Sequence, residues 1–529
     1  MNRIFYLLFA FVLLSACGSQ KNVISGGEFT QPKMPLVTGK ENLLASFKLA
    51  TKNLNAITEV KVSLKSELKS LDLSEIAIYL SDKENFKEAQ QFASTKSVQS
   101  TTLLKGNYLP KTENTYVWVT TKTTENPNLL NKIKVFQIEF SSNGARYVYV
   151  NPKSPAQRFG ITLRDKKQDG IECYRIPGLA TTNKGTLIAV YDNRYNNCKD
   201  LQEDVNVGMS RSTDGGQTWE PMKEIMDLGE WGGLDNRLNG IGDPAVLVDK
   251  TTGTIWVAAL WLHGHDKDKM AWWASKPGMT PHETGQLMLV KSEDDGITWS
   301  EPINITAQTK DPKWYLFFNG PGSGITLNDG KIMFAAQYKD ENQVPHSTLI
   351  YSDDHGKTWH CGTGAKSHTT EAQVVQLSDG SIMLNMRDDR NRQNYTLSDA
   401  FHGRSVAVTR DFGKTWTEHS TSRKALTEPN CMASIISLDK NGKKYLFFSN
   451  PADAKKRVNM TIKISDDDGN TWDKLPALKL YENEGFGYSC MSIIDNKYIG
   501  ILYEGAGDLI FQKIPIEEFI KNQTNLKKF

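Results

Sequence analysis

Six side chains of the kinds that bind anions and transfer protons stand at comparable places in a series of repeated segments. They are three arginines, two carboxylates and a tyrosine: Arg175, Arg387, Arg457, Asp200, Glu371 and Tyr488. Guanidinium groups that face one another repel unless an anion lies between them. A guanidinium also meets a carboxylate or a phosphate through two parallel hydrogen bonds. If the fold brings these residues together, we expect a site for an anionic ligand.

Eight-residue boxes mark the repeats that must position these side chains. The pattern Ser/Thr-x-Asp-x-Gly-x-Thr-Trp occurs five times, at residues 212–219, 292–299, 352–359, 409–416 and 465–472. In a tight turn the Asp accepts backbone N–H groups, the Gly supplies a left-handed conformation and the Trp buries apolar surface. We therefore interpret the boxes as architectural. Their starts lie 80, 60, 57 and 56 residues apart, which is typical of a propeller or a similar radial array.

Two short apolar strands recur with the boxes and indicate the number of repeats. The first strands open at six positions, which are Tyr174, Gly242, Gly320, Thr370, Cys431 and Tyr488. The second strands open at Gly185, Gly253, Gly330, Gly380, Gly442 and Lys497. The sequence thus predicts an all-β protein with a six-bladed β-propeller over residues 151–516. Its last blade has no box, and we expect residues 158–164 to supply the outer strand there.

Propeller geometry decides which residues share a face. The first strand of each blade is innermost, so its start faces the central funnel, and the boxes lie on the opposite face. The starts of the first strands carry Arg175, Asp243, Glu371, Asn430 and Tyr488. The adjoining loops and strand ends add four further side chains, which are Arg194, Asp200, Arg387 and Arg457. We predict that these residues converge at the mouth of the funnel.

The start of the chain is typical of an exported protein. One Arg and a long apolar run precede Leu14-Ser15-Ala16-Cys17, which is similar to a bacterial lipoprotein box. Residues 1–17 are therefore predicted to be a lipoprotein signal peptide that ends at Cys17, the residue to be lipidated. We expect the protein to be held by its lipid in a bacterial membrane, with the outer membrane and the cell surface favoured. The membrane face stays open.

Three more segments flank the propeller. Residues 18–40 are rich in Gly, Pro, Ser and Lys, as in a tether. Residues 41–150 contain alternating apolar and polar segments with Asn/Lys/Thr-rich turns, which predict a small β-sandwich of immunoglobulin-like or lectin-like type. A carbohydrate-binding module and a rigid spacer are both open for this domain. Residues 517–529 are predicted to be a C-terminal tail.

Composition excludes several classes of function. The chain has 529 residues and a formal net charge of +2, so it presents no strong field to nucleic acid or to a membrane surface. Five cysteines remain besides Cys17, and this odd, dispersed set predicts no disulfide framework. His263, His265 and Asp266 lack a further ligand at a suitable spacing, so we interpret them as a solvated loop. No metal and no cofactor is expected.

One combination of motifs is specific enough to indicate a protein family. The segment Tyr174-Arg175-Ile176-Pro177, followed by five boxes, resembles the bacterial exo-sialidase (neuraminidase) family, and the resemblance covers residues 150–515. It implies a retaining glycoside hydrolase on a six-bladed propeller. The expected substrates are the sialylated glycans of glycoproteins and glycolipids, and contact with a membrane is expected through the lipid anchor alone.

The resemblance also implies roles for the substrate-binding residues. Arg175, Arg387 and Arg457 are similar to the three arginines that clamp the carboxylate of sialic acid. Arg194 resembles an arginine near the 4-hydroxyl of the sugar. Asp243 is expected to support the N-acetyl side of the pocket.

Three further residues resemble the catalytic group of the family. Tyr488, in GFGYSCMS, is similar to its tyrosine nucleophile, and Glu371 to the glutamate that partners it. Asp200 resembles the acid/base aspartate. Three nearby acids compete with it for this role, which are Asp192, Glu203 and Asp204.

The chemistry accounts for these residue types. Sialic acid bears a carboxylate on its anomeric carbon, so a carboxylate nucleophile would approach a like charge. A neutral tyrosine avoids this repulsion, but a phenol with a pKa of about 10 is a weak nucleophile near neutrality. Glu371 would take the phenolic proton during attack. Asp200 would protonate the leaving oxygen and later deprotonate the attacking water.

Three alternatives stay open at this point. A trans-sialidase would use the same catalytic residues with a different acceptor site. A sialic-acid-binding propeller without turnover would lack the equivalents of Tyr488 or Glu371, and both are present. A preference for deaminated sialic acid would require a pocket that rejects the N-acetyl group. The linkage preference is open as well.

Overall fold

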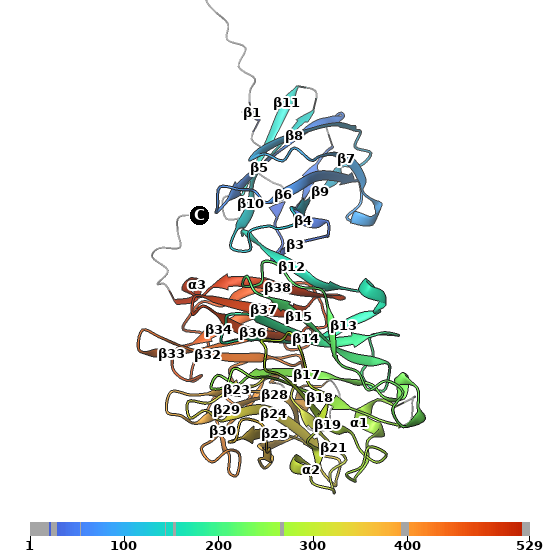
Figure 1. The fold of residues 1–529 in the computed structure, drawn as a ribbon. Helices are drawn as coiled ribbons and strands as arrows, with labels where there is room; N and C mark the ends of the chain where they lie inside the picture. The colour runs from blue at the N-terminus through green and yellow to red at the C-terminus, as the bar shows by residue number, and fades with distance from the viewer. Residues whose placement is uncertain are drawn as a thin grey trace, which may run out of the picture.

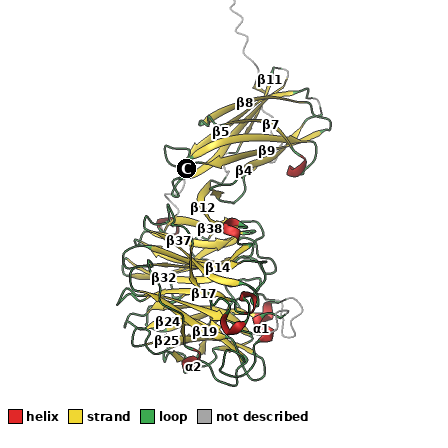
Figure 2. Ribbon diagram, turned by 45° about the vertical axis from the view of Figure 1, so that its right-hand side comes forward, coloured by secondary structure: helices red, strands yellow, loops and turns green. Residues whose placement is uncertain are grey.

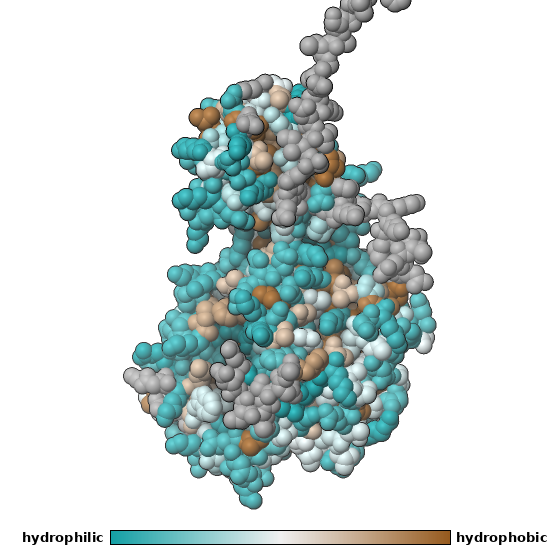
Figure 3. All heavy atoms as spheres, turned by 180° about the vertical axis from the view of Figure 1, so that it is seen from behind, coloured by the Kyte–Doolittle hydropathy of each residue, from teal (hydrophilic) through white to brown (hydrophobic). Residues whose placement is uncertain are grey.

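The structure is a computed structural model that describes residues 21–22 and 29–520, except 53, 143, 152–154, 265–268 and 393–400. Figure 1 shows a smaller β domain, drawn in blue, stacked on a larger domain that runs from green to red. Strands dominate both domains and the helices are short (Figure 2). Among the described residues, no helix has the length and apolar character needed to cross a membrane. Hydrophilic side chains cover most of the face seen in Figure 3, with apolar ones scattered between them.

The smaller domain consists of two facing sheets. One has the order β2 (Phe29–Thr30), β4 (Asn42–Ala50), β9 (Asn114–Thr123), β6 (Leu73–Ser81), β7 (Gln90–Thr95). The other contains β1 (Lys21–Asn22), β11 (Ala145–Val150), β10 (Lys132–Ser142), β5 (Ile57–Ser66) and β8 (Thr101–Tyr108). Val60, Val62 and Leu64 of β5 are buried. They alternate along the strand because successive side chains point to opposite faces of a sheet.

The predicted tether over residues 18–40 differs from the structure in its second half. Residues Phe29–Thr30 pair with β4, and β3 (Leu36–Val37) pairs with β12 of the larger domain. Leu36 is fully buried and Val37 nearly so. Gly39 lies in a turn between β3 and β4, and Pro32 and Pro35 lie in the segment between β2 and β3. Cys17 and the rest of the predicted signal peptide lie outside the described residues.

Six antiparallel sheets follow one another through the described part of the larger domain. The first sheet consists of β13 (Cys173–Thr181), β14 (Leu187–Arg194), β15 (Val205–Ser212) and β16 (Lys223–Met226). The second consists of β17 (Ile241–Val248), β18 (Ile255–Trp261), β19 (Gln286–Ser292) and β20 (Ile303–Asn304). The third contains β21 (Leu316–Asn319), β24 (Ile332–Lys339), β25 (Pro345–Ser352) and β26 (His360–Cys361). The fourth sheet consists of β28 (Thr369–Gln376), β29 (Ile382–Asp388), β30 (Ser405–Thr409) and β31 (Thr417–Glu418). The fifth consists of β32 (Ser434–Lys440), β33 (Lys443–Pro451), β34 (Met460–Ser465) and β35 (Leu478–Tyr481). The sixth consists of β36 (Ser489–Ile494), β37 (Tyr498–Glu504), β38 (Asp508–Pro515) and β12 (Gln157–Asp165).

These sheets close on themselves as in a β-propeller. First strands of neighbouring sheets contact one another, except that β28 of the fourth sheet packs against β24 of the third. The ring closes where β36 of the last sheet contacts β13 of the first. The expected outer strand of the last sheet is confirmed, because Ile161 and Thr162 of β12 pair with Phe511 and Ile510 of β38. The beginning of β12 pairs with β10 of the smaller domain. One strand thus joins the two domains, and a short helix, α3 (Glu517–Ile520), follows β38.

The third sheet departs from the predicted pattern. Its first strand was expected to run without a break from Gly320, but it is divided into β21, β22 (Gly322–Ser323) and β23 (Ile325–Thr326). A Cβ at Gly320 would lie 2.6 Å from the carbonyl oxygen of Ala372. The glycine therefore permits a close backbone approach to the fourth sheet, and the strand bends away at this point.

Each box forms the predicted turn at the end of a third strand. In the box at 292–299, Asp294 accepts hydrogen bonds from the backbone N–H groups of Ile297 and Thr298, at 3.1 and 2.8 Å. Gly296 has a left-handed φ of 87°. The hydroxyl group of Thr298 donates to the same carboxylate. These hydrogen bonds, that of the Thr298 hydroxyl foremost, lower the pKa of Asp294 to about 2.

Removing the carboxylate of a box should lower stability in a pH-dependent way. The pKa of Asp294 in the folded protein lies below its ordinary value, so its contribution is present above about pH 4 and is lost as the pH falls toward 2. We expect Asp294→Asn to reduce the free energy of unfolding by about 1 kcal/mol at pH 6, since the amide replaces an acceptor with a donor. The difference in melting temperature from wild type should shrink between pH 4 and 2. The matched control is Glu293→Gln, which changes the adjacent exposed carboxylate. An equal effect of both variants would contradict the prediction.

Candidate active site

A cavity of about 430 Å³ opens at the face where first and third strands of the larger domain begin and second strands end, opposite the boxes. Its polar wall contains Asp200, Asp243, Glu371, Arg387, Asn430 and Tyr488. Its apolar wall contains Leu201, Leu260, Met270, Trp273, Leu316 and Phe318. An elongated polar ligand with one apolar substituent would be complementary to these two walls.

Tyr488, Glu371 and Arg387 form one hydrogen-bonded group. The Tyr488 hydroxyl donates to Glu371 Oε1. Arg387 Nη1 donates to the Tyr488 oxygen at 2.9 Å and to Glu371 Oε2 at 2.6 Å. Glu371 and Arg387 come from paired strands, β28 and β29, and an irregularity in their register lies next to Glu371. Such a bulge changes the direction of a side chain, here toward the cavity.

The phenol of Tyr488 is held in its neutral form. Burial, and then the negative charge of Glu371, raise the pKa of Tyr488 well above its ordinary value of 10.0, although Arg387 and Arg457 oppose the shift. A neutral hydroxyl that donates to a carboxylate has its proton directed at the group that can accept it. The pair is therefore prepared for proton transfer to Glu371 when the oxygen attacks an electrophile.

Three guanidinium groups surround this tyrosine. Arg175 and Arg457 lie 5.6 and 5.5 Å from the centre of the Tyr488 ring, and Arg387 bonds its hydroxyl. Arg457 donates to two backbone carbonyls, those of Phe486 at 2.9 Å and Asn430 at 3.2 Å. Because neutral oxygens hold Arg457, its charge remains available to an anion. The structure thus brings the three sequence-predicted arginines together.

Two residues that fix the arginines were not assigned a role from the sequence. Glu504 accepts from Arg175 Nε at 2.6 Å through one oxygen and from the backbone N–H of Tyr488 at 2.9 Å through the other. Asn430 Oδ1 accepts from Arg387 Nη2 at 2.8 Å. The sequence does hold a clue to the role of Glu504, because this acidic residue ends an otherwise apolar strand, β37. In the structure Glu504 is 2% exposed. A buried carboxylate in such a place requires a cationic partner.

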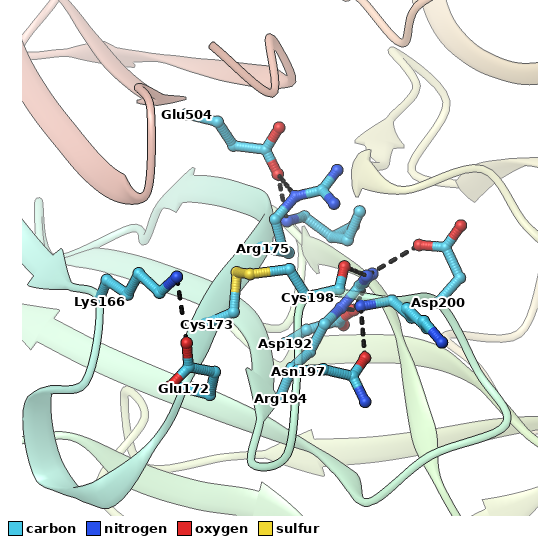
Figure 4. Close-up of a disulfide and its surroundings, with 12 residues drawn as sticks. Lys166, Glu172, Cys173, Arg175, Asp192, Arg194, Asn197, Cys198, Asp200 and Glu504 are labelled. Carbon is cyan, nitrogen blue, oxygen red and sulfur yellow. Dashed lines mark hydrogen bonds and ion pairs between the residues drawn. A yellow bond between two sulfur atoms is a disulfide. The ribbon is translucent and has the colours of Figure 1, made fainter.

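Asp200 lies across the cavity on the loop after β14. Arg194 Nη1 donates to Asp200 at 2.8 Å, and Arg194 Nη2 donates to Asp192 at 2.8 Å (Figure 4). The Asp200 side chain is 62% exposed to the cavity, but the protein around it still removes part of its hydration, which favours a higher pKa. The charges of Arg194, Arg175 and Arg387 outweigh this effect and lower the pKa. Asp200 is therefore ionised in the free protein near neutral pH.

The rival acids are placed differently. Asp192 is buried, and its second oxygen accepts the backbone N–H of Asp243 at 2.8 Å. Glu203 accepts from Asn196 within the loop. Among Asp192, Glu203, Asp204 and Asp200, Asp200 is the one that lines the cavity. Burial and the charges of Asp192 and Asp200 raise the pKa of Asp243 well above its ordinary value.

The prediction that the cysteines form no disulfide is wrong for one pair. Cys173, the first residue of β13, is bonded to Cys198 in the loop that follows β14, with Cα atoms 5.2 Å apart. The register of the β13–β14 hairpin pairs Cys173 with Arg194, and the loop then turns back toward it. A spacing of 25 residues does not reveal this contact. The other cysteines among the described residues, Cys361, Cys431 and Cys490, are free.

The interpretation of His263 as part of a solvated loop is also wrong. His263 is fully buried, its Nδ1 atom bonds the side chain of Asn239, and its ring centre lies 4.4 Å from that of Trp231. His265 and Asp266 lie outside the described residues. The described part of the chain contains no group of three or more His, Cys, Asp or Glu side chains arranged to hold a metal.

Comparison with known proteins gives a consistent set of relatives. Residues 185–501 match the family model described as "BNR repeat-like domain". The chain is 41% identical to a sialidase of Bacteroides fragilis over 520 residues, 92% of this chain and 94% of the relative. It is 33% identical to a sialidase of Micromonospora viridifaciens, covering 64% of this chain and 51% of that one.

Solved structures agree with these relatives. The "Hadza microbial sialidase Hz136" is 38% identical and superposes with a TM-score of 0.85, covering 93% of this chain and 99% of that chain. An intramolecular trans-sialidase from Ruminococcus gnavus gives a TM-score of 0.55 at 19% identity, covering 68% of this chain and 98% of that chain. At 19% identity this second likeness shows the fold alone.

The contact between Glu504 and Arg175 makes a prediction for stability. Glu504→Ala would leave a buried guanidinium without its anionic partner, and we expect a loss of about 3–5 kcal/mol in the free energy of unfolding. The measurement is chemical denaturation, supported by the melting temperature.

Asp235→Ala provides the matched control for this prediction. Asp235 pairs with Arg237 in an ion pair whose side chains are 55% and 64% exposed. Its loss should change the free energy of unfolding far less than Glu504→Ala, because solvent screens an exposed ion pair. Losses of equal size in the two variants would show that Glu504 does not have the role inferred here.

Proposed function

The chain belongs to the sialidase family and is an exo-sialidase, a glycoside hydrolase; from this premise we propose that it releases terminal α-linked sialic acids with retention of configuration, through Tyr488 as nucleophile. The observation that carries the proposal is the Tyr488 hydroxyl, which donates to Glu371 and lies beneath three guanidinium groups. The proposed substrates are the sialylated glycans of glycoproteins, glycolipids and oligosaccharides.

The arginines first orient the substrate. Arg175, Arg387 and Arg457 would bind its carboxylate, and this places the anomeric carbon, to which the carboxylate is attached, over Tyr488. Glu504 and Asn430 keep two of these guanidinium groups in place. The apolar wall of the cavity, including Leu260 and Phe318, is suited to the acyl group of the sugar.

The nucleophilic step follows from the resting hydrogen bonds. The Tyr488 oxygen forms a bond to the anomeric carbon while its proton passes to Glu371, and the glycosidic bond breaks. Arg387 Nη1, which donates to the tyrosine oxygen, stabilises the negative charge that develops on it. A neutral phenol approaches the substrate carboxylate without the repulsion that a carboxylate nucleophile would meet.

Asp200 completes the reaction as acid and then base. It is ionised in the free protein because three arginines lower its pKa. A bound substrate carboxylate offsets part of that positive charge, so the pKa of Asp200 rises and the group can take up a proton. It then protonates the departing oxygen. In the second step it removes a proton from water, which attacks the anomeric carbon, and Tyr488 leaves with the proton held by Glu371.

Two alternatives receive less support. Transfer to another acceptor would use the same residues, but the relatives that share 41% and 38% identity are named sialidases. A binding propeller without turnover has no need for a neutral tyrosine bonded to a glutamate. We therefore favour hydrolysis.

We further propose that the six sheets are six blades of the propeller and that the smaller domain is a β-sandwich.

Export and lipidation at Cys17 are proposed from the sequence. The Cys173–Cys198 disulfide supports export, because such bonds persist in oxidising compartments. In the native host, a tagged fatty acid should label the wild-type protein, and replacement of Cys17 by Ala should abolish that labelling because it removes the thiol to be acylated. Equal labelling of the variant and the wild type would refute a lipid anchor at this residue.

Turnover of sialosides by protein lacking residues 1–17 tests the catalytic proposal. Tyr488→Phe should lower kcat by at least about 100-fold, because it removes the nucleophilic oxygen. The matched control is Tyr503→Phe, a buried tyrosine that donates to Gln512 instead. Its activity should stay close to wild type.

Three outcomes would overturn parts of the proposal. Binding of a sialoside by folded wild-type protein without turnover would remove the catalytic assignment. A Tyr488→Phe rate close to wild type would mean that another group is the nucleophile. Proton NMR of the sialic acid first released identifies its anomer, and an inverted anomer would contradict retention.

A further inference from the structure

The Cys173–Cys198 disulfide lies between two groups that the proposed reaction uses. Cys173 begins β13, two residues before Arg175, and Cys198 lies two residues before Asp200. Figure 4 shows the disulfide between the strand that carries Arg175 and the loop that carries Asp200. The bond therefore connects the carboxylate-binding side of the site with the acid/base side.

The loop before Asp200 has few other attachments. Within the described residues, the disulfide is the contact that ties residues 196–200 to a distant part of the chain. The other contacts are local: Arg194 donates to the Cys198 carbonyl at 2.9 Å and to Asp200 at 2.8 Å, and Asn196 donates to Glu203 at 3.1 Å. The loop is anchored again only beyond Asp200, where Leu201 is buried and its carbonyl accepts from the N–H of Ala271.

The Asp200 side chain itself is exposed. Its carboxylate is 62% exposed, whereas the Arg194 side chain that holds it is 2% exposed. An exposed carboxylate on a loop has rotational freedom that a single ion pair restricts weakly. The disulfide at Cys198, two residues before Asp200, restricts the backbone conformations of the loop and therefore the positions that the Asp200 carboxylate can reach.

We propose that the Cys173–Cys198 disulfide is a positioning device that holds the Asp200 loop in the geometry for proton transfer to the leaving group. The proposal rests on the proposed function and adds to it a positioning role for these two cysteines. It also makes full activity depend on an oxidising compartment.

Substrate binding should be separable from this effect. Arg175 is held on its other side by Glu504, through a 2.6 Å hydrogen bond between buried groups, so it keeps its place when the disulfide is broken. Loss of the disulfide should therefore reduce proton donation and leave the binding of the substrate carboxylate in place.

The leaving group provides the decisive comparison. A sugar alkoxide leaves only with a proton, whereas an aryl oxide such as that of an umbelliferyl sialoside leaves without one. The comparison uses kcat/KM, which reports the step that breaks the glycosidic bond, because the second step needs Asp200 as a base with either substrate. For Cys173→Ser/Cys198→Ser we expect kcat/KM on sialyllactose to fall by about 10- to 100-fold. On the aryl sialoside it should change by less than about threefold, and affinity for a non-hydrolysed unsaturated sialic acid analogue by less than about twofold. Melting temperatures of both proteins establish that each is folded at the assay temperature.

Reduction of the wild-type protein gives an independent route to the same state. Two exchange steps with excess dithiothreitol convert the disulfide into two cysteine thiols, and the reagent leaves as its cyclic disulfide. Alkylation and mass spectrometry show how much of the bond is reduced. The reduced wild type should lose sialyllactose turnover selectively, and the double variant, as the matched control, should not respond to the reagent.

The outcomes separate the possible explanations. Equal losses of kcat/KM on both substrates would mean that the bond serves stability alone. Unchanged kcat/KM on both would mean that the loop is positioned without it. Either result overturns the proposal. Wild-type protein that turns over neither substrate would instead refute the proposed function.

Discussion

Three positive charges gathered around one buried phenol are the physical constraint on which the rest of the site depends. Arg175, Arg387 and Arg457 repel one another, and the protein keeps them together with oxygens of two kinds. Carboxylates hold Arg175 and Arg387, while backbone carbonyls hold Arg457. Among the described residues no carboxylate forms an ion pair with Arg457, so the group has charge available for one more anion. Arg175 and Arg387 also add to the charge of Arg194, which lowers the pKa of Asp200.

Closure of the ring assembles this group of charges. Arg175 and its partner Glu504 are 329 residues apart in sequence and belong to the first and the last sheet. They meet because β36 packs against β13 and because β12 completes the last sheet. The boxes stabilise turns on the opposite face and contribute nothing to the cavity directly. Chemistry and architecture are thus separated along each strand, with the charged groups at one end and the turns at the other.

The sequence was informative wherever a feature repeats. Equivalent positions in successive repeats predicted the strands, the turn of Gly296 and the convergence of Tyr488 with Glu371, because repeats place equivalent residues on one face. Features that occur once were missed. The bond between Cys173 and Cys198 depends on the path of a single loop, and the interrupted strand near Gly320 depends on a close approach to another sheet. Composition misled for residues 29–40, where short apolar segments pair with strands far away in sequence.

One strand belongs to both domains at once. The first residues of β12 pair with β10 of the smaller domain, and the following residues pair with β38 of the propeller. A pull on the smaller domain would therefore act along β12 as shear on the hydrogen bonds that close the ring. Force on one domain is passed to the other through β12, which is hydrogen-bonded to strands of both. Tension at the amino-terminal end would therefore reach the strand that closes the ring, next to the sheet that carries Glu504, the partner of Arg175.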